Sequence, residues 1–572
     1  MQNRQVTDWS VQALSLESER LGPLPLVNHF LERLGLEALL DRFVPTLDRR
    51  VRLPYAKALL VLLRSVLVER EPLYRQSETV HGFCAAAFGL KADEMVSDDA
   101  IGQGLDRLFD ADRAGLLTAV VVSATEAFDL RLSELHQDTT SISFCGQYRE
   151  ARGRRVRGRR APLITYGFSK AHRPDLKQLL WVLTTTADGA VPVQFRCEDG
   201  NTSDSRTHAG TWDTLVKATG RTDFLYVADS KLCCEAAMDH IDRRAGRFVC
   251  VLPRSRSEDS EFREWLQTHE PAWELLWDRP NRRRQGGPRD RWWVHRALLP
   301  SHEGWPVVWV KSSSLELRRR QSRRERLLAA TETLETLNAR LAGPRPRRRS
   351  REQILQYLER VLRRYRVAQY LRVELVHELA HQFRQTRRGR PGPNTQYQRK
   401  SKQHWQVRFS IDETAIAYDR KSDGMYPLLS NDRTLTNAQI LEAHKRQPTI
   451  EKRFSQSKSV FEIAPVCLKN EGRIEALFYL YFLVLLVQAL IERELRRAMQ
   501  REQITTLPLY PEERATRRPT AEQILRLFSH TTRSVLRHKT QEIRRFDPEL
   551  TDIQRQILTL LAVPPSAYRL AT

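Results

Sequence analysis

The chain has 572 residues, too many for one compact core, and this length predicts about three or four domains. It carries 94 Lys and Arg residues against 70 Asp and Glu, which gives a formal net charge of +24, and many of the arginines lie in clusters. A solubilising surface needs only mixed charges, so this excess favours a polyanionic partner, and nucleic acid is the first candidate.

The seven cysteines show no CxxC pair and no Cys/His ligand spacing, so we expect reduced, packed thiols rather than a zinc site or a disulfide framework. The stretch MQNRQVTDWSVQ has no apolar core of a signal peptide. The most apolar run, from Ala476 to Val487, is shorter than the ~20 residues that span a bilayer, and it predicts a core helix. We therefore expect a cytoplasmic protein, associated with the nucleoid through DNA, and no membrane partner.

The first part of the chain reads as helical. Residues from about 20 to 130 show helical apolar periodicity between short polar breaks, which predicts an all-helical N-terminal domain (1–130) and a candidate for binding a DNA end. From Leu135 onward the pattern changes to strand-like stretches at 137–146, 163–169 and 179–197, the last broken by the turn signal Asp188-Gly189.

Helix, strand, helix and strand follow in turn, so residues 131–254 predict the first part of a mixed α/β core and not an all-β sandwich.

Residues 255–404 leave this core. Strands are expected at 292–299 and 305–312, followed by a long helix with apolar heptad positions at Leu327, Ala330, Leu334, Leu337 and Leu341. A second helix is expected from about Glu352 to Gln385, and the Gly-Pro break between the two predicts a helical hairpin.

The core then resumes. Residues 405–500, with strands expected at 405–411, 414–419 and 425–431, form its second part and include Glu451. Residues 501–572 predict a helical C-terminal region, in which Thr520 and Gln523 match a capping box.

Two aspartates interrupt apolar strands of the predicted core. Asp138 lies in the first strand, and Asp229 ends the strand FLYVADS. If these strands are neighbours in the sheet, the two carboxylates converge and repel each other, and binding of Mg²⁺ would relieve this repulsion. Glu451 is the candidate third acid of a site for two Mg²⁺ ions, with Mn²⁺ as a possible substitute, which would support phosphoryl transfer.

Other basic and aromatic residues are candidates for DNA contact. Lys458 follows Glu451 by seven residues and so shares its helical face. The run YREARGRRVRGRR, with Arg152, Arg154 and Arg155, comes directly after the first carboxylate strand and is expected to meet backbone phosphates, although a solvated loop is the alternative. Trp292 and Trp293 could stack on an unpaired base, but a half-buried pair in a strand is the simpler interpretation.

Several blocks resemble the DDE transposases of bacterial insertion sequences, in the same order along the chain. These blocks are QDTTSISFCG, GFSKAHRPDLKQ, DGAVPVQFRCEDGNTSD, FLYVADSKL, the stretch from DGMYPLLSN to TIEKRFSQSKS, and APVCLKNEGRIEALFYLYF. The resemblance covers most of residues 130 to 500. It implies a ribonuclease-H-like catalytic core, with Asp138, Asp229 and Glu451 as the catalytic metal-binding acids and Lys458 as the lysine of the Glu-x6-Lys signature.

The resemblance also implies that residues 255–404 are the long insertion that this branch places before the Glu, which in related enzymes helps to hold the transposon end or the dimer. One departure stands out. The signature has a Tyr seven residues and an Arg four residues before the Glu, and here these positions are His444 and Gln447. Lys445 and Arg446 beside them could supply the charge. The sequence therefore leaves open whether DNA cleavage passes through a DNA hairpin intermediate.

We therefore expect a transposase that binds the terminal inverted repeats of its element, cleaves DNA and joins the ends to target DNA, as a homodimer on paired ends. The alternatives are a metal-dependent nuclease of the same fold without strand transfer, and a DNA-binding protein with an inactive site.

Overall fold

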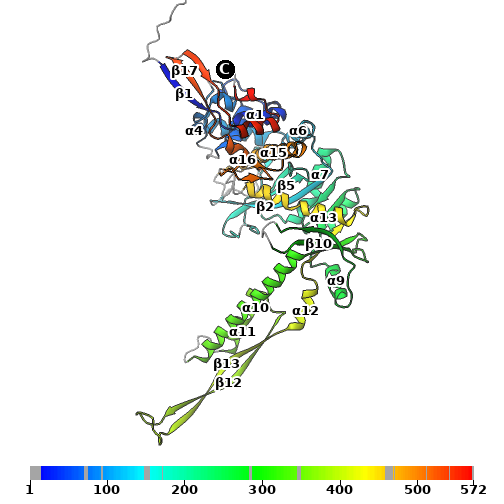
Figure 1. Cartoon of the computed structure of the whole chain (residues 1–572), viewed down its shortest axis with the longest axis vertical. Coiled ribbons are helices and arrows are strands. Elements are labelled where there is room, and N and C mark those ends of the chain that lie inside the picture. The colour runs from blue at the N-terminus through cyan, green and yellow to red at the C-terminus, as the bar shows by residue number, and fades with distance from the viewer. Residues whose placement is uncertain are drawn as a thin grey trace, which may run out of the picture. The chain divides into compact units, whose positions relative to one another are not determined.

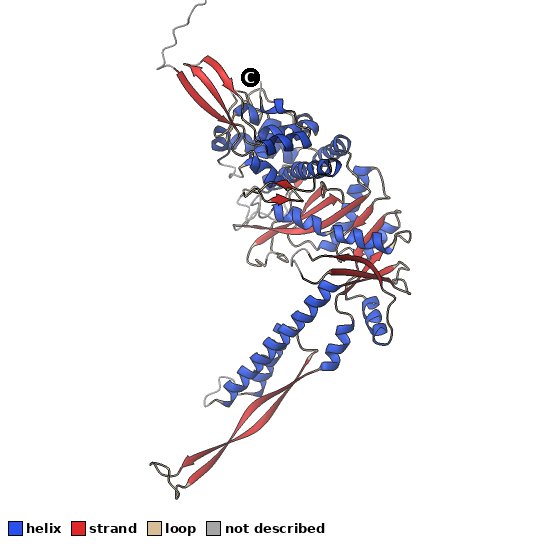
Figure 2. Ribbon diagram, in the orientation of Figure 1, coloured by secondary structure: helices blue, strands red, loops and turns tan. Residues whose placement is uncertain are grey.

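The computed structural model describes residues 14–69, 75–91, 94–146, 148, 155–170, 172–281, 287–343, 350–457, 468, 470–510, 512–539 and 541–569. The chain is a mixed α/β protein with many helices (Figures 1 and 2). It divides into two compact units: the first combines Met1–Cys250 with Glu442–Thr572, and the second is Val251–Leu441.

The first unit begins with a short strand and a group of helices. These elements are β1 (Leu14–Arg20), α1 (Leu24–Arg33), α2 (Leu36–Phe43), α3 (Tyr55–Val68), α4 (Gln76–His81), α5 (Asp98–Asp110) and α6 (Arg113–Phe128). Ser97 and Asp112 accept hydrogen bonds from backbone N–H groups in the first turns of α5 and α6, so both helices begin at a capping side chain.

Five strands form the sheet of the first unit, in the order β6-β5-β2-β7-β8. The strands and their connecting helices are β2 (Glu134–Phe144), β5 (Lys177–Thr186), β6 (Pro192–Glu198), α7 (Thr207–Thr219), β7 (Leu225–Val227), α8 (Glu235–Asp242) and β8 (Arg247–Val251). Strands β2, β5 and β6 are antiparallel neighbours, whereas β2, β7 and β8 run parallel. The expected Asp-Gly turn joins β5 to β6, with Gly189 at φ 83°.

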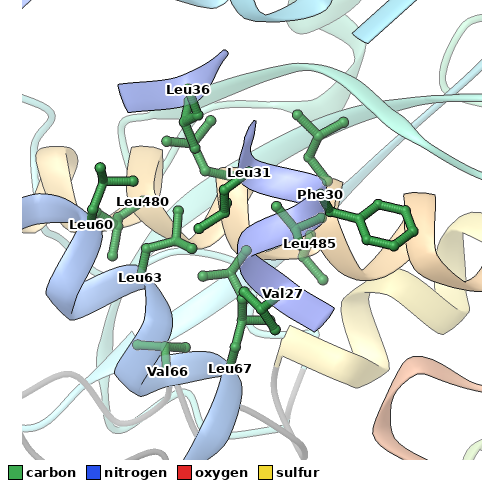
Figure 3. Packing of buried hydrophobic residues seen from close by; sticks show 14 of the residues in the cluster. Val27, Phe30, Leu31, Leu36, Leu60, Leu63, Val66, Leu67, Leu480 and Leu485 are labelled. Atoms are coloured by element: carbon green, nitrogen blue, oxygen red, sulfur yellow. The ribbon is translucent and has the colours of Figure 1, made fainter. Parts of the chain in front are cut away.

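The helix α15 (Glu471–Arg501) forms the centre of this unit. Its aromatic residues pack on the sheet, with ring centroids 5.7 Å apart for Trp181 and Phe478 and 5.1 Å apart for Phe195 and Phe482. Other residues of α15 contact α1, α3 and α5. Figure 3 shows Leu480 and Leu485 of α15 among apolar residues of α1 and α3. By length and composition α15 could cross a membrane, but 89% of its most apolar window is buried inside the protein, as expected for a core helix.

The first unit has further elements besides its sheet and α15. They are β3 (Arg155–Val156), β4 (Arg159–Arg160), α13 (Asn437–Arg446), which crosses the boundary between the units, α14 (Pro448–Ser455), β15 (Leu507–Pro508), β16 (Ala515–Thr516), α16 (Ala521–Leu527), β17 (Thr532–His538), β18 (Gln541–Phe546) and α17 (Asp552–Leu560). The capping box expected at Thr520 and Gln523 is confirmed at the start of α16.

The second unit combines a sheet, two long helices and a long hairpin. Its elements are α9 (Ser257–Thr268), β9 (Glu274–Arg279), β10 (Asp290–Arg296), β11 (Val307–Ser312), α10 (Ser313–Ala342), α11 (Arg351–Tyr365), β12 (Leu371–Gln385), β13 (Tyr397–Ile411), α12 (Glu413–Lys421) and β14 (Met425–Ser430). Strands β14-β11-β10-β9 are antiparallel in this order. All five expected heptad residues of α10 are buried.

Four expectations about secondary structure are wrong. The helix expected up to Gln385 ends at Tyr365, and the following residues form β12, which pairs with β13 along its whole length. The strand expected at 414–419 lies in α12, because the Asp412 side chain accepts from Ala415 N and caps a helix there. In the stretch 163–169, only an isolated bridge from Thr165 to Gln178 forms.

The fourth error concerns both ends of the chain. The N-terminal domain is not all-helical and the C-terminal region is not purely helical, because β1 pairs with β17 and β17 with β18 in a three-stranded sheet.

Candidate active site

Two neighbouring strands bring Asp138 and Asp229 together. Strand β2 pairs with β7 in parallel, and His136 lies opposite Val227. Asp229 follows the end of β7 by two residues, and its carboxylate is close enough to Asp138 to raise the pKa of that group. Because successive side chains alternate between the faces of a sheet, Asp138 lies on the face of His136 and Thr140.

Burial and mutual repulsion shape the charge of these two carboxyl groups. Burial raises the pKa of Asp138 to about 6, and the Asp229 and Asp204 carboxylates add to this rise, whereas Lys170 and the Thr139 N–H oppose it. Burial also raises the pKa of Asp229. Each side chain accepts one backbone hydrogen bond, Asp138 from Thr139 N at 2.7 Å and Asp229 from Lys231 N at 2.8 Å. The pair is therefore a site where a cation would be favourable.

Lys170 and Asp204 belong to the same site, and the sequence interpretation missed both. The Lys170 Nζ donates to the Thr139 carbonyl at 2.6 Å and to the Thr139 hydroxyl at 2.8 Å, and it lies 3.0 Å from Asp204 Oδ2. Lys170 therefore offsets part of the negative charge next to Asp138. Asp204 begins a 3₁₀ turn in a polar loop, and no pattern in the sequence marks it as a site residue.

The helix α14 lies over the face to which Asp138 belongs. Its Phe454 packs edge-on against Trp181, which pairs with Thr140, and α14 contacts both β2 and β5. Glu451 is exposed on this helix, one turn after Gln447. The Gln447 side chain donates to the Gln137 carbonyl at 2.8 Å, directly before Asp138 in the strand. The fold therefore holds the helix of Glu451 against the strand of Asp138.

A polar network fixes the start of α14. His136 Nδ1 lies 2.9 Å from Gln447 Oε1, and His136 Nε2 lies 2.9 Å from Glu134. Arg446 forms an ion pair with Glu134 at 2.7 Å, so its charge is engaged within the protein. Burial lowers the pKa of His444 to about 3, with contributions from Lys445 and His136, and this imidazole is therefore neutral near pH 7.

Arg453 anchors the other side of α14. The residue is 1% exposed, and its guanidinium group donates to the Gly189 and Ala190 carbonyls, each at 2.9 Å, and to Glu492 of α15 at 3.1 Å. Burial alone would raise the pKa of Glu492, but Arg453, Lys452 and Arg496 hold it below its usual range. Arg453 thus ties the helix that carries Glu451 to the β5–β6 turn and to the core.

The acidic residues do not all converge. Within the described residues, no group of three or more His, Cys, Asp and Glu side chains is close enough to hold a metal ion, so Glu451 does not complete a cluster with the aspartates. Asp138 and Asp229 nevertheless fit Mg²⁺ as ligands, because they offer oxygen donors whose ionised form is disfavoured without a cation.

The expected phosphate-binding residues are only partly described. Lys458, Arg152 and Arg154 lie outside the described residues. Arg155 is exposed at the start of the small β3–β4 hairpin. Two neighbours in the same run have structural partners, since Arg157 pairs with Asp106 at 2.8 Å and Arg160 with Asp199 at 2.7 Å.

Trp292 and Trp293 belong to the second unit and are half-buried in β10. Trp292 packs edge-on against Trp277, with ring centroids 5.8 Å apart, and Lys311 lies 5.8 Å from the ring centroid of Trp293. Both side chains therefore have packing partners within their own sheet.

The second unit also contains a strongly basic cavity of about 520 Å³. Its acidic wall residues are engaged, because Asp423 accepts from Arg323 at 2.6 Å and Asp419 accepts from Gln369 at 2.7 Å and from Tyr370. Burial and the nearby charges of Arg254 and Arg263 lower the pKa of Arg319. The arginines that line the cavity are Arg254, Arg318, Arg319, Arg323, Arg326 and Arg366.

Among these six arginines, Arg323 alone forms an ion pair within the described part of the chain. The charge arrangement fits an anionic ligand such as phosphate.

No protein-family model matches the sequence, and no curated protein matches it. Among solved structures, the chain is similar to piggyBac transposase in a synaptic complex with hairpin DNA, with a TM-score of 0.39 and 8% sequence identity over 88% of this chain and 79% of that chain.

Proposed function

We propose that the chain is a DNA transposase with a ribonuclease-H-like core, which binds the terminal inverted repeats of its element, cleaves them and joins the ends to target DNA. The observation that carries this proposal is the pair Asp138, in β2, and Asp229, two residues after the adjacent parallel strand β7, where burial raises the pKa of each carboxyl group. Two neighbouring, partly buried carboxylates are typical of the sites where enzymes that cleave phosphodiesters bind divalent cations.

The proposed cofactor is Mg²⁺, as two ions, with Mn²⁺ as a substitute. Asp138 and Asp229 would hold the ions, and Glu451, which is exposed on the helix α14 that packs against β2, would be the third ligand. When bound, the ions supply activation of the attacking oxygen and stabilisation of the leaving oxygen.

The neighbouring residues prepare this site. Lys170, through Thr139, fixes the backbone next to Asp138 and limits the negative charge that a DNA phosphate would meet. Gln447 and Arg453 position the helix that carries Glu451. His444 and Gln447 replace the Tyr and Arg of the family signature, and Arg446 is paired with Glu134, so none of these three residues offers a free charge to a hairpin end.

Duplex DNA is the proposed partner, both as element ends and as target. The excess of basic residues and the arginine cavity of the second unit support it. Joining two element ends requires two active sites, so we propose a homodimer on paired ends.

One observation favours a second candidate, a DNA-binding protein without catalysis. Glu451 lacks a cluster with the two aspartates within the described residues. A nuclease without strand transfer shares the same site, and only its products distinguish it from a transposase.

The test uses purified protein and labelled DNA that spans the boundary of the repeats flanking its gene, with Mg²⁺ or with EDTA. Cleavage at the repeat end, lost in EDTA and in Asp138→Asn, is the expected result, and joining of the cut end to a plasmid separates a transposase from a nuclease. The matched control is Asp223→Asn, an exposed acid two residues before β7 that pairs with Arg221 at 2.7 Å and should leave cleavage unchanged. Binding without any cut in Mg²⁺ or Mn²⁺ would refute the catalytic proposal.

A further inference from the structure

The long β12–β13 hairpin of the second unit is an interaction surface that the proposed active site does not use. Its two strands pair over fifteen residues each, from Leu371 with Ile411 to Gln385 with Tyr397. In Figure 2 the end of this ribbon extends beyond α10 and α11, which lie beside its base. A two-stranded ribbon by itself is only marginally stable in water, so its packing along its length is informative.

The base of the hairpin is covered by the two helices. Leu371, Val373 and Leu375 of β12 belong to the apolar cluster of α10 and α11. Asn338 of α10 donates to the Val407 carbonyl at 2.7 Å and accepts from Val407 N at 2.8 Å. This packing explains why the base of the ribbon is stable.

The free end of the hairpin differs from its base. Beyond the stacked rings of His377 and Trp405, whose centroids are 3.5 Å apart, the apolar side chains on the same face are exposed: Leu379 by 61%, Phe383 by 64% and Tyr397 by 51%. Large apolar side chains on a thin ribbon are costly to expose, and they indicate a partner.

The charge of this end identifies the partner. From Leu379 to His404, the part beyond the stacked rings, the sequence contains no Asp or Glu and seven Lys and Arg residues. These are Arg384, Arg387, Arg388, Arg390, Arg399, Lys400 and Lys402. A second copy of the chain would bring the same positive charges to the contact and repel it, whereas the phosphates of nucleic acid complement them.

The dimensions of the hairpin favour double-stranded DNA. A two-stranded β-ribbon fits the major groove of B-DNA, which is about 12 Å wide. Phe383 and Arg399 are direct neighbours across the two strands, as are Arg384 and Gln398 on the other face, so each face presents a basic or amide group. We propose that the free end of the β12–β13 hairpin inserts into a groove of duplex DNA, with the tip arginines on the flanking phosphates and the exposed aromatic side chains against the bases.

This inference rests on the proposed function only in that it names duplex DNA as the partner. Its test is binding of the full-length protein to a short labelled duplex, measured by fluorescence anisotropy in EDTA so that cleavage plays no part. Two triple variants remove equal charge from the second unit: Arg387→Ser, Arg388→Ser and Arg390→Ser at the tip, and Arg360→Ser, Arg363→Ser and Arg364→Ser on the exposed surface of α11.

The tip variant should bind at least about tenfold more weakly than the α11 variant. The slope of its plot of log affinity against log salt concentration should be smaller in magnitude than that of the α11 variant, by about two to three. Phe383→Ser should weaken binding without a change in this slope, because it removes no charge.

Equal affinities and slopes for the two triple variants would overturn the inference. Dissociation of a DNA-free dimer by Phe383→Ser would overturn it as well, since the exposed face would then be an interface between copies. If the tip variant loses binding while the wild-type protein never cuts DNA, the hairpin inference stands and the catalytic proposal falls. If the wild-type protein does not bind duplex DNA, or prefers single-stranded RNA, the hairpin inference falls.

Discussion

The clearest test of the aspartate site is the stability of the metal-free protein. Asp138 is half-buried, and burial with the neighbouring carboxylates raises its pKa from 3.8 to about 6. Ionisation of this carboxyl group is therefore less favourable in the folded protein than in the unfolded chain, and the difference lowers the free energy of unfolding. At about 1.4 kcal/mol for each pH unit of difference, the cost at pH 7 is at most about 3 kcal/mol, and partial solvent access reduces it to about 1–3 kcal/mol.

The sign of the pH dependence follows from the direction of the shift. The folded carboxyl group keeps its proton to a higher pH than the unfolded one, so stability falls as the pH rises from about 4 to about 6 and stays lower above that range. Asn cannot ionise. Asp138→Asn should therefore unfold at a higher temperature than the wild-type protein at pH 7 in EDTA, and at pH 5 about half of this difference should remain.

The expected size is small but measurable. The first unit has about 380 residues, and unfolding entropies of about 2.1 cal/mol/K per residue convert 1 kcal/mol into about 1 °C. Calorimetry in EDTA should therefore show a rise of about 1–3 °C for Asp138→Asn. Addition of Mg²⁺ should stabilise the wild-type protein and not the variant, because a cation that binds only the folded carboxylates shifts the equilibrium toward the folded state.

The control residue, Asp223, has a pKa shift in the opposite direction to that of Asp138. Arg221 holds the pKa of Asp223 below its usual range through a hydrogen bond, so Asp223→Asn should give no gain at pH 7. If Asp138→Asn is no more stable than the wild-type protein at pH 7, or if its advantage does not shrink at pH 5, the burial of this carboxylate has been misjudged and its role as a cation ligand loses its physical basis.

Three further predictions concern residues around the site and in the basic cavity. Arg453→Met leaves the buried carboxylate of Glu492 with weaker partners, so we expect a loss of about 3–5 kcal/mol in the free energy of unfolding, measured in urea, and an unchanged value would contradict the anchoring role. Gln447→Ala removes the bond to the strand before Asp138; cleavage should fall while DNA affinity stays constant, and a parallel loss of both would contradict this separation. Arg254→Gln with Arg318→Gln should weaken binding to duplex DNA and reduce its salt dependence by about one to two in log-log slope, and an unchanged slope would show that the cavity holds no backbone phosphate.

The sequence alone determined the local elements whose signals are short-range. The strands and helices between Lys177 and Val251, the Asp-Gly turn and the capping box at Thr520 lie where their patterns predict, because turn and cap chemistry depends on neighbouring residues only. The heptad positions from Leu327 to Leu341 and the apolar run of α15 likewise identify their buried faces.

Tertiary structure decided the secondary structure where the sequence pattern was ambiguous, and it decided the strand pairing where the partners are distant in the sequence. Leu371, Leu375 and Leu379 satisfy a helical spacing as well as a strand alternation, and pairing with β13 selects the strand. The sheet of β1 and β17 joins residues at opposite ends of the chain, a contact with no local signature.

In the candidate active site, too, the sequence identifies some residues and the tertiary structure decides which others lie beside them. Asp138 and Asp229 stand out as acids in apolar strands, and their sequence context alone makes them candidates. That Lys170 and Asp204 lie beside them, that Gln447 and Arg453 hold the helix of Glu451, and that the Glu451 side chain remains exposed depends on the pairing of β2 with β7 and on the packing of α14. These contacts join residues up to about three hundred positions apart, and only the folded chain brings such residues within hydrogen-bond distance.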